Sequence, residues 1–152
     1  MKVIIIAGAG SKVGKTTVLR SLKAFFPNSI SVKLGKKEAE DKNKEELLLP
    51  SNSTLAQIKA ALSQEPEYLL IEGNALLKTF KPDLAIFVDG EPEKPREDAK
   101  ELQIRSHLVV GTKVDCQQAF ILAGRIGLER AKFGQLLNKL KIKVQKCQLG
   151  CF

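Results

Sequence analysis

The chain has 152 residues, of which 43% are hydrophobic and 28% charged, with three cysteines and a formal net charge of +8 at pH 7. This length and balance predict a compact globular protein and exclude the disordered, fibrous and disulfide-scaffold classes. The apolar runs are too short to span a bilayer, so we expect no membrane segment and a cytoplasmic location.

Positive charge is concentrated towards the C-terminus. Residues 116–152 carry seven basic side chains against Glu129 alone, a net charge of +6, whereas residues 1–115 carry a net charge of only +2. The seven are Arg125, Arg130, Lys132, Lys139, Lys141, Lys143 and Lys146. This asymmetry indicates an anionic partner, without saying which one.

The first part of the chain alternates a strand, a helix and a strand. Residues 2–7 are a β-branched run typical of a strand covered on both faces. Residues 14–26 have helical apolar spacing and end at a Pro-Asn pair, and residues 29–34 predict a second strand. Residues 35–46 are dense in charge and predict a loop. Within this loop, Asp41 is a candidate Mg²⁺-touching switch residue.

The middle of the chain continues the alternation. Residues 50–53 supply helix N-cap chemistry. The apolar stripe of the helix they would begin is Leu55, Ile58, Ala61 and Leu62. Further strands are predicted at 68–71, 84–88 and 107–110. A Pro-rich turn at 90–95 precedes a short helix at 96–104. This alternation predicts a doubly wound, mostly parallel α/β sheet.

Residues 116–152 follow a different pattern, so we place a boundary after residue 115. Helices are predicted at 116–125 and 129–140, with a last short strand at Ile142 and Val144. Their glycine turn resembles a helix-turn-helix, which would bind nucleic acid through its phosphates. The alternatives are a module that docks a protein partner or a second copy, and an extension that simply closes the α/β fold.

A phosphate-binding motif follows the first strand. Residues 9–16 read Ala-Gly-Ser-Lys-Val-Gly-Lys-Thr and nearly match G-x-x-x-x-G-K-[ST], with alanine at the first position. Small residues let backbone N–H groups surround a phosphate, and the following helix directs its positive end at it. The predicted nucleotide contacts here are Gly10, Ser11, Lys12, Val13, Gly14, Lys15, Thr16 and Thr17.

Three side chains have predicted roles in this chemistry. Lys15 would bridge the β- and γ-phosphates of a triphosphate and stabilise charge during hydrolysis, and the Thr16 hydroxyl would coordinate Mg²⁺. Glu72 ends the third strand and would hold Mg²⁺ or orient the attacking water, although a solvent-facing strand terminus is its structural alternative. Asp89 ends the next strand similarly, and a structural role suits it equally well.

A candidate base-recognition motif follows the fifth strand. In Thr112-Lys113-Val114-Asp115, the carboxylate of Asp115 could accept the N1–H and N2–H₂ donors of guanine. The aliphatic stem of Lys113 could lie along the base, with Thr112 beside it. At the carboxyl end of a late strand, these residues would share a sheet edge with the phosphate loop. The alternative is a solvated polar loop.

Two C-terminal cysteines raise the question of a second metal. Cys147 and Cys151 supply two thiolates, which is half a tetrahedral site, so zinc or an iron–sulfur cluster would need Cys116 or a second subunit. Reduced thiols in a terminal turn are the favoured interpretation.

The order and spacing of residues 9–17, 71–74, 84–90 and 112–115 resemble the small P-loop GTPases of cofactor and metallocentre assembly. The resemblance covers about residues 1–115. It is to two branches, the molybdopterin-guanine dinucleotide biosynthesis protein B family and the nickel-insertion GTPases of hydrogenase and urease maturation. It implies GTP and Mg²⁺ binding, slow hydrolysis, and an adaptor or switch role with a protein partner.

The sequence also departs from both branches. The segment Val32-Lys33-Leu34-Gly35-Lys36 lacks the histidines usual after the second strand of the first branch. The nickel proteins have a Cys/His metal site, whereas His107 is the sole histidine here and begins a predicted strand. The alternative functions are a nucleotide-responsive nucleic-acid-binding regulator and a small-metabolite kinase.

Overall fold

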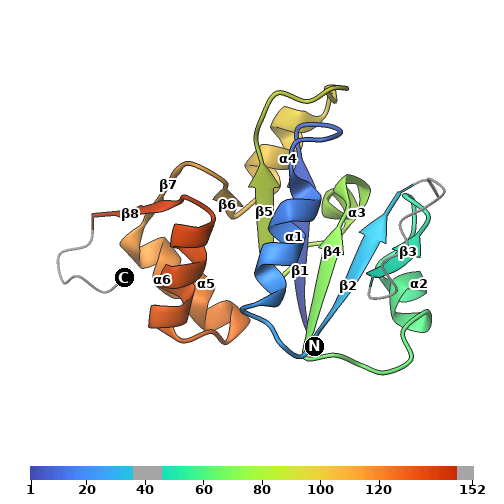
Figure 1. Ribbon diagram of the computed structural model, residues 1–152, viewed down its shortest axis with the longest axis horizontal. Helices are drawn as coiled ribbons and strands as arrows, with labels where there is room; N and C mark the ends of the chain where they lie inside the picture. Colours follow the sequence, from blue (N-terminus) through green and yellow to red (C-terminus); the bar gives the residue numbers. More distant parts are fainter. Residues whose placement is uncertain (36–45, 147–152) are drawn as a thin grey trace.

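The structure of the chain, a computed structural model, describes residues 1–35 and 46–146 (Figure 1). Its centre is a six-stranded sheet in which every neighbouring pair runs parallel. In spatial order the strands are β3 (Glu46–Leu49), β2 (Ser29–Leu34), β4 (Tyr68–Glu72), β1 (Lys2–Gly8), β5 (Leu84–Val88) and β6 (Leu108–Val109). The predicted α/β class with a mostly parallel sheet is therefore confirmed.

The β-branched run of β1 divides between two hydrophobic cores. Because successive side chains of a strand point to opposite faces, Ile4 and Ile6 enter one cluster while Val3, Ile5 and Ala7 enter the other. Four of these five are completely buried, and Val3 is 4% exposed. A central strand covered on both faces has no polar face to show, which explains the uninterrupted apolar sequence.

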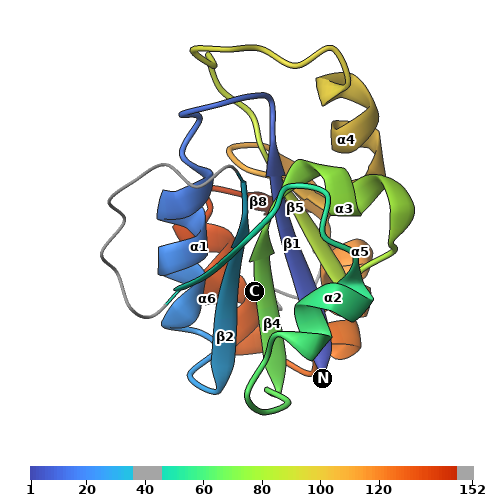
Figure 2. The same cartoon turned by 90° about the vertical axis from the view of Figure 1, so that its right-hand side faces the viewer.

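Within the described part of the chain, three helices cover each face of the sheet, and Figure 2 shows α1 and α3 on opposite sides of it. The helices that share a core with Ile4 and Ile6 are α1 (Lys15–Lys23), α5 (Cys116–Ile126) and α6 (Arg130–Lys139). The helices on the other core are α2 (Leu55–Ala60), α3 (Asn74–Thr79) and α4 (Ala99–Arg105). The arrangement is compatible with a doubly wound fold.

Three elements lie where the sequence predicts none: β3, α3 and β7 (Lys113–Asp115). Strand β3 begins at Glu46, the last residue of the predicted charged loop, and pairs with β2 at the edge of the sheet. Residues 36–45 of that loop, with Asp41, lie outside the described residues. Helix α3 follows β4 directly, in a stretch without predicted structure. All three elements are short, so none offers the periodicity that identifies a longer helix or strand.

Several predicted boundaries also shift. Helix α1 ends at Lys23, and α4 begins at Ala99 because residues 90–98 form a longer connection than the predicted turn. The cap of α2 is Thr54, one residue beyond the predicted 50–53, and its hydroxyl accepts from the Gln57 amide while the Gln57 side chain accepts from the Thr54 amide. This reciprocal pair satisfies two backbone donors at once. In the predicted apolar stripe of α2, Ala61 is exposed.

The C-terminal helices are part of the main core. Both were predicted, and Gly127 turns the chain between them with a positive φ of 72°. Their buried residues include Ala119, Leu122 and Phe133, which share one hydrophobic cluster with Ile4 of the central strand. Residues of both helices therefore contribute to the core that covers one face of the sheet.

Beside these helices, β7 (Lys113–Asp115) and β8 (Lys143–Gln145) form a separate two-stranded parallel sheet. The strand predicted near Ile142 and Val144 is therefore present, as β8. Of the predicted base motif, Lys113, Val114 and Asp115 form β7, which belongs to the separate sheet and not to the main one. Gly111, with φ of 79°, redirects the chain after β6, and its amide donates to the Leu140 carbonyl 3.1 Å away.

Candidate functional site

The loop of residues 9–14, here the glycine-rich loop, connects β1 to α1 (Figure 2). Two of its residues adopt left-handed backbone conformations, Lys12 with φ of 58° and Gly14 with φ of 98°. Gly14 is the N-cap of α1, and no acidic residue lies in the first turn of that helix. The amides that begin a helix have no partner within it, so this turn presents N–H donors and a partial positive charge to an anion.

The departure from the motif at Ala9 is accommodated by the core. Ala9 is 8% exposed, and its methyl group joins the same hydrophobic cluster as Ala7 and Phe87. A Cβ at this position therefore fills apolar space behind the loop and does not enter the space in front of it. Gly8 and Gly10, on either side of Ala9, approach neighbouring atoms too closely for a side chain.

Lys15 begins α1, and its ammonium group turns back to donate to the carbonyl oxygen of Gly10. Burial lowers the pKa of Lys15, and the charges of Arg96 and Lys33 lower it further, while Glu72 opposes them. Lys33 lies directly across from Glu72 in the β2–β4 register. Two cations and one carboxylate thus act on the half-buried ammonium group of Lys15, an arrangement that a bound polyanion would stabilise.

Thr16 and Glu72 bring two oxygen atoms together from different elements. The Thr16 hydroxyl donates to Oε2 of Glu72 over 2.8 Å, and Glu72 is only 6% exposed. Glu72 reaches this position because β4 is the neighbour of β1, with Glu72 paired to Ile6 near the start of the glycine-rich loop. A hydroxyl and a carboxylate oxygen are ligands that Mg²⁺ prefers, so these two residues fit the predicted cation.

Asn74 fixes the start of the glycine-rich loop, a role the sequence does not reveal. Its side chain accepts from the Gly8 amide over 3.0 Å and donates to the Gly8 carbonyl over 2.9 Å. A Cβ on Gly8 would lie 2.8 Å from the Val13 side chain and 3.0 Å from the Val88 carbonyl oxygen. Glycine and a two-way amide clamp therefore define how the chain leaves β1.

The connection from β5 to α4 lies against the glycine-rich loop like an added strand. Gly10 and Pro95 form an antiparallel bridge. The Ser11 amide donates to the Lys94 carbonyl over 3.3 Å, and the Arg96 amide donates to the Ala9 carbonyl over 3.0 Å. A Cβ on Gly10 would lie 2.2 Å from the Lys94 carbonyl oxygen, so only glycine permits this approach.

A cavity of about 570 Å³ opens in front of these groups. Its lining is Gly10, Ser11, Lys15, Leu34, Ser51, Glu72, Gly73, Asn74, Ala75, Lys94, Pro95 and Arg96. This volume lies within the range that holds cofactors and nucleotides, and polar groups from four separate segments converge on it. The predicted catalytic pair, Lys15 and Glu72, therefore shares one cavity.

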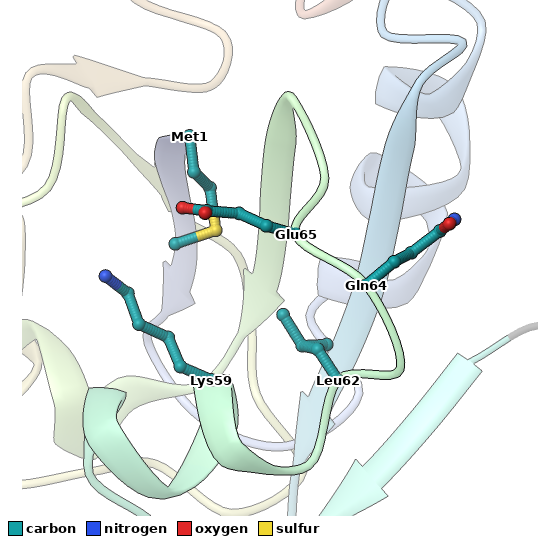
Figure 3. A pocket seen from close by; sticks show the side chains of 5 residues that line it. All are labelled: Met1, Lys59, Leu62, Gln64 and Glu65. Carbon is teal, nitrogen blue, oxygen red and sulfur yellow. The ribbon is translucent and has the colours of Figure 1, made fainter.

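A second cavity, of about 280 Å³, lies beside Met1, at the amino end of β1. Figure 3 shows Met1, which precedes β1, near the side chains of Lys59 and Glu65, with Leu62 and Gln64 completing the lining. The glycine-rich loop instead follows the carboxyl end of β1. In parallel α/β sheets ligands bind at the carboxyl ends of the strands, so the larger cavity is the candidate site.

The structure does not bring the predicted base motif to this cavity. None of Thr112, Lys113 and Asp115 is among the described residues that line it. The Asp115 carboxylate accepts from Gln145 Nε2 over 2.7 Å and from Lys146 Nζ over 3.1 Å, and these two hydrogen bonds lower its pKa. Thr112 donates to the Val109 carbonyl over 2.7 Å. Recognition of guanine by these residues stays a prediction.

The remaining candidates have the following positions. Cys147 and Cys151 lie outside the described residues, and Cys116 is buried at the start of α5. Over residues 1–35 and 46–146, no group of three or more His, Cys, Asp or Glu side chains is arranged to hold a metal. Asp89 is exposed and accepts from the Gly90 amide, which is a local turn contact.

His107 is packed in the fold, as its predicted place at the start of a strand suggests. Its Nδ1 accepts from the Ala85 amide over 2.8 Å. Burial lowers its pKa, and the nearby charges of Arg125 and Lys81 lower it further. The folded state is therefore more stable when the imidazole of His107 is neutral.

This pKa shift predicts acid destabilisation through His107. Because the folded-state pKa lies below the unfolded value near 6.5, the stabilisation is present above about pH 6.5 and is lost as the pH falls through the folded-state pKa. We expect the free energy of unfolding, measured in urea, to fall between pH 7.5 and pH 5. In His107→Asn, whose side-chain oxygen can replace Nδ1, the slope should be shallower. An identical slope in the variant would remove His107 as the cause.

No family model, curated protein or solved structure matches this chain. Among the described residues, no helix combines the length and apolar character needed to cross a bilayer.

Proposed function

We propose that the chain is a P-loop protein that binds a nucleoside triphosphate with Mg²⁺ in the 570 Å³ cavity and hydrolyses it slowly. The observation that carries this proposal is the hydrogen bond from the Thr16 hydroxyl to the buried Glu72 carboxylate, beside the ammonium group of Lys15. A Mg²⁺ ligand from the motif helix, a carboxylate at the end of the neighbouring strand and a phosphate-binding lysine are the parts that P-loop chemistry requires.

The proposed roles follow from these positions. Amides of the glycine-rich loop and the first turn of α1 would hold the β-phosphate, and Lys15 would leave the Gly10 carbonyl to bridge the β- and γ-phosphates. Thr16 and Glu72 would hold Mg²⁺, which supplies charge neutralisation between the two phosphates. In hydrolysis, a water oxygen bonds to the γ-phosphorus while the bond from phosphorus to the bridging oxygen breaks. The diphosphate leaves with that electron pair, and the two protons of the water pass to the inorganic phosphate formed and to solvent.

We infer that the base is guanine and that the protein acts as an adaptor or switch in cofactor or metallocentre assembly. Both proposals are supported by the resemblance of residues 1–115 alone, because the residues of the base motif, Asp115 included, do not line the cavity. A protein partner or a second copy of the chain would then read the nucleotide state. Mass spectrometry of the nucleotide retained by the purified protein identifies the base, and retention of adenine nucleotide alone would contradict the guanine assignment.

A second candidate function is nucleic-acid binding through the tail. All seven basic side chains of residues 116–146 are exposed, although one of them, Arg130, stacks 4.2 Å over the Phe120 ring and another, Lys146, pairs with Asp115. Phosphate-backbone binding would make the affinity for duplex DNA fall steeply with salt. Equal affinity at 50 and 200 mM salt would exclude this function.

The Mg²⁺ dependence of binding tests the central proposal. We expect wild-type protein to bind a non-hydrolysable GTP analogue more tightly with Mg²⁺ than with EDTA. Thr16→Val keeps the shape of the side chain but removes the hydroxyl, so this difference between Mg²⁺ and EDTA should largely disappear. Isothermal titration measures both affinities.

Thr79→Val is the matched control for this measurement. Its hydroxyl donates to the Leu76 carbonyl within α3, away from the cavity. The control should retain the wild-type Mg²⁺ dependence. Full Mg²⁺ dependence in Thr16→Val would contradict the assignment of Thr16 as a ligand.

A further inference from the structure

The connection from β5 to α4 contributes a cation to the proposed nucleotide site. Arg96 lines the same cavity as Lys15 and Glu72, although it lies far from both in the sequence. Its backbone is held against the glycine-rich loop, because its amide donates to the Ala9 carbonyl and the preceding Pro95 pairs with Gly10. These backbone contacts fix the Cα atom of Arg96 relative to the amides of the glycine-rich loop.

The guanidinium of Arg96 is also oriented. Its Nε and Nη2 donate to the two carboxylate oxygens of Asp98 over 2.7 and 2.8 Å. Asp98 receives a second cation, because the Lys78 ammonium group lies 2.6 Å from its Oδ2. The hydrogen bonds from Arg96 and Lys78 hold the pKa of Asp98 far below its usual range, so this anchor stays ionised at neutral pH.

This arrangement leaves donors and charge for a ligand. Two cations share one carboxylate, so the cluster of Arg96, Asp98 and Lys78 keeps a net charge of +1. Among the described residues, the Nη1 group of Arg96 has no hydrogen-bond acceptor, and 42% of the side chain is exposed. A guanidinium held on one edge and open on another is suited to donating to phosphate oxygens.

The other groups of the site indicate which phosphate this would be. The loop amides and the start of α1 would bind the β-phosphate, and Thr16 with Glu72 would hold Mg²⁺, which would neutralise charge on the phosphate chain. The charge of Arg96 reaches Lys15, whose pKa it lowers. Because the loop and α1 would already hold the β-phosphate, a cation that a separate segment adds to the same cavity would be left to contact the terminal phosphate.

We propose that Arg96 binds the γ-phosphate and makes the chain distinguish triphosphate from diphosphate. The inference rests on the proposed function and adds to it the group that senses the terminal phosphate. The same positive charge would stabilise the phosphoryl group as it separates from the diphosphate during hydrolysis. Loss of the γ-phosphate would then release the Arg96 contact, while the contacts of the loop amides to the β-phosphate remain.

The test compares triphosphate with diphosphate binding in the full chain. Isothermal titration with Mg²⁺ uses a non-hydrolysable GTP analogue and GDP, and the matching adenine pair, so that base preference does not decide the outcome. Arg96→Ala should bind the triphosphate analogue about 10- to 100-fold more weakly, the effect of losing hydrogen bonds to a charged group. Its diphosphate affinity should stay within about twofold of wild type.

Two further variants separate the contact from general effects. Arg105→Ala removes the same charge from α4, where Arg105 pairs with Glu101 outside the cavity, and it should leave both affinities unchanged. Arg96→Lys keeps a partner for Asp98 but lacks the planar fork, so it should lose only part of the triphosphate affinity. Thermal unfolding followed by circular dichroism verifies that each variant is folded.

The possible results separate the γ-phosphate contact of Arg96 from the proposed nucleotide binding itself. If the wild type binds neither nucleotide, the proposed function fails and Arg96 loses its role with it. If the wild type binds both and Arg96→Ala weakens both equally, or neither, the γ-phosphate contact is overturned while nucleotide binding stands. Selective loss of triphosphate affinity in the two Arg96 variants, and not in Arg105→Ala, supports the contact.

Discussion

Lys15→Ala is expected to lower the affinity for a non-hydrolysable GTP analogue by about 100-fold or more, because each lost charge-assisted hydrogen bond to phosphate costs about 1.5–3 kcal/mol. In the free protein the ammonium group is half-buried beside Glu72, where burial lowers its pKa. Isothermal titration gives the affinity, and circular dichroism establishes that the variant is folded.

Lys23→Ala is the matched control for Lys15→Ala. Lys23 lies at the other end of the same helix, in its last turn, so its replacement makes the same change in net charge and side-chain length. It should bind the analogue with wild-type affinity. If both variants bind like the wild type, the glycine-rich loop is not the phosphate site.

Phe133→Ala is expected to destabilise the whole chain by about 3–5 kcal/mol, the usual cost of removing a fully buried phenylalanine side chain. The ring is 0% exposed and belongs to the cluster that includes Ile4 of the central strand. Chemical unfolding should therefore show one cooperative transition, shifted to lower denaturant concentration. A domain boundary after residue 115 with independent folding would instead give two transitions, of which only one moves.

Phe120→Ala is the control for this measurement. Phe120 is on α5, is partly exposed and stacks with Arg130. The same substitution should cost much less there, because fewer contacts are lost. Equal effects of the two substitutions would show that the ring of Phe133 does not contribute to the shared core as the structure indicates.

The parallel sheet is predictable because each of its longer strands has one of two recognisable patterns. The run at 84–88 is continuously apolar, as in a strand buried on both faces, whereas the run at 29–34 alternates polar and apolar residues. The structure has strands with both of these bounds. Strand β3 is missed because only three residues separate the charged segment, which ends at Glu46, from Pro50, and the side chains of β3 are only partly buried. Helix α3 has six residues, too few for a helical period to appear.

In the candidate site, the sequence identifies residues that belong to a local pattern. The motif at residues 9–16 predicts Lys15 and Thr16, and the end of a predicted strand indicates Glu72. Asn74 and Arg96 are not predicted, because their roles depend on contacts with residues 66 or more positions away. Such contacts leave no local pattern. They follow from the order of strands in the sheet, which the sequence does not state.

The antiparallel bridge between Gly10 and Pro95 has a consequence for the order in which the protein matures during synthesis. The glycine-rich loop is made first, yet Ala9 and Ser11 hydrogen-bond to residues 94 and 96, and β1 needs β5 on its open edge. Contacts so distant in sequence form late, because the intervening chain must first be ordered. A ribosome-bound fragment ending at residue 90 should therefore lack the finished loop, and nucleotide affinity should appear only after the connection to α4 has emerged.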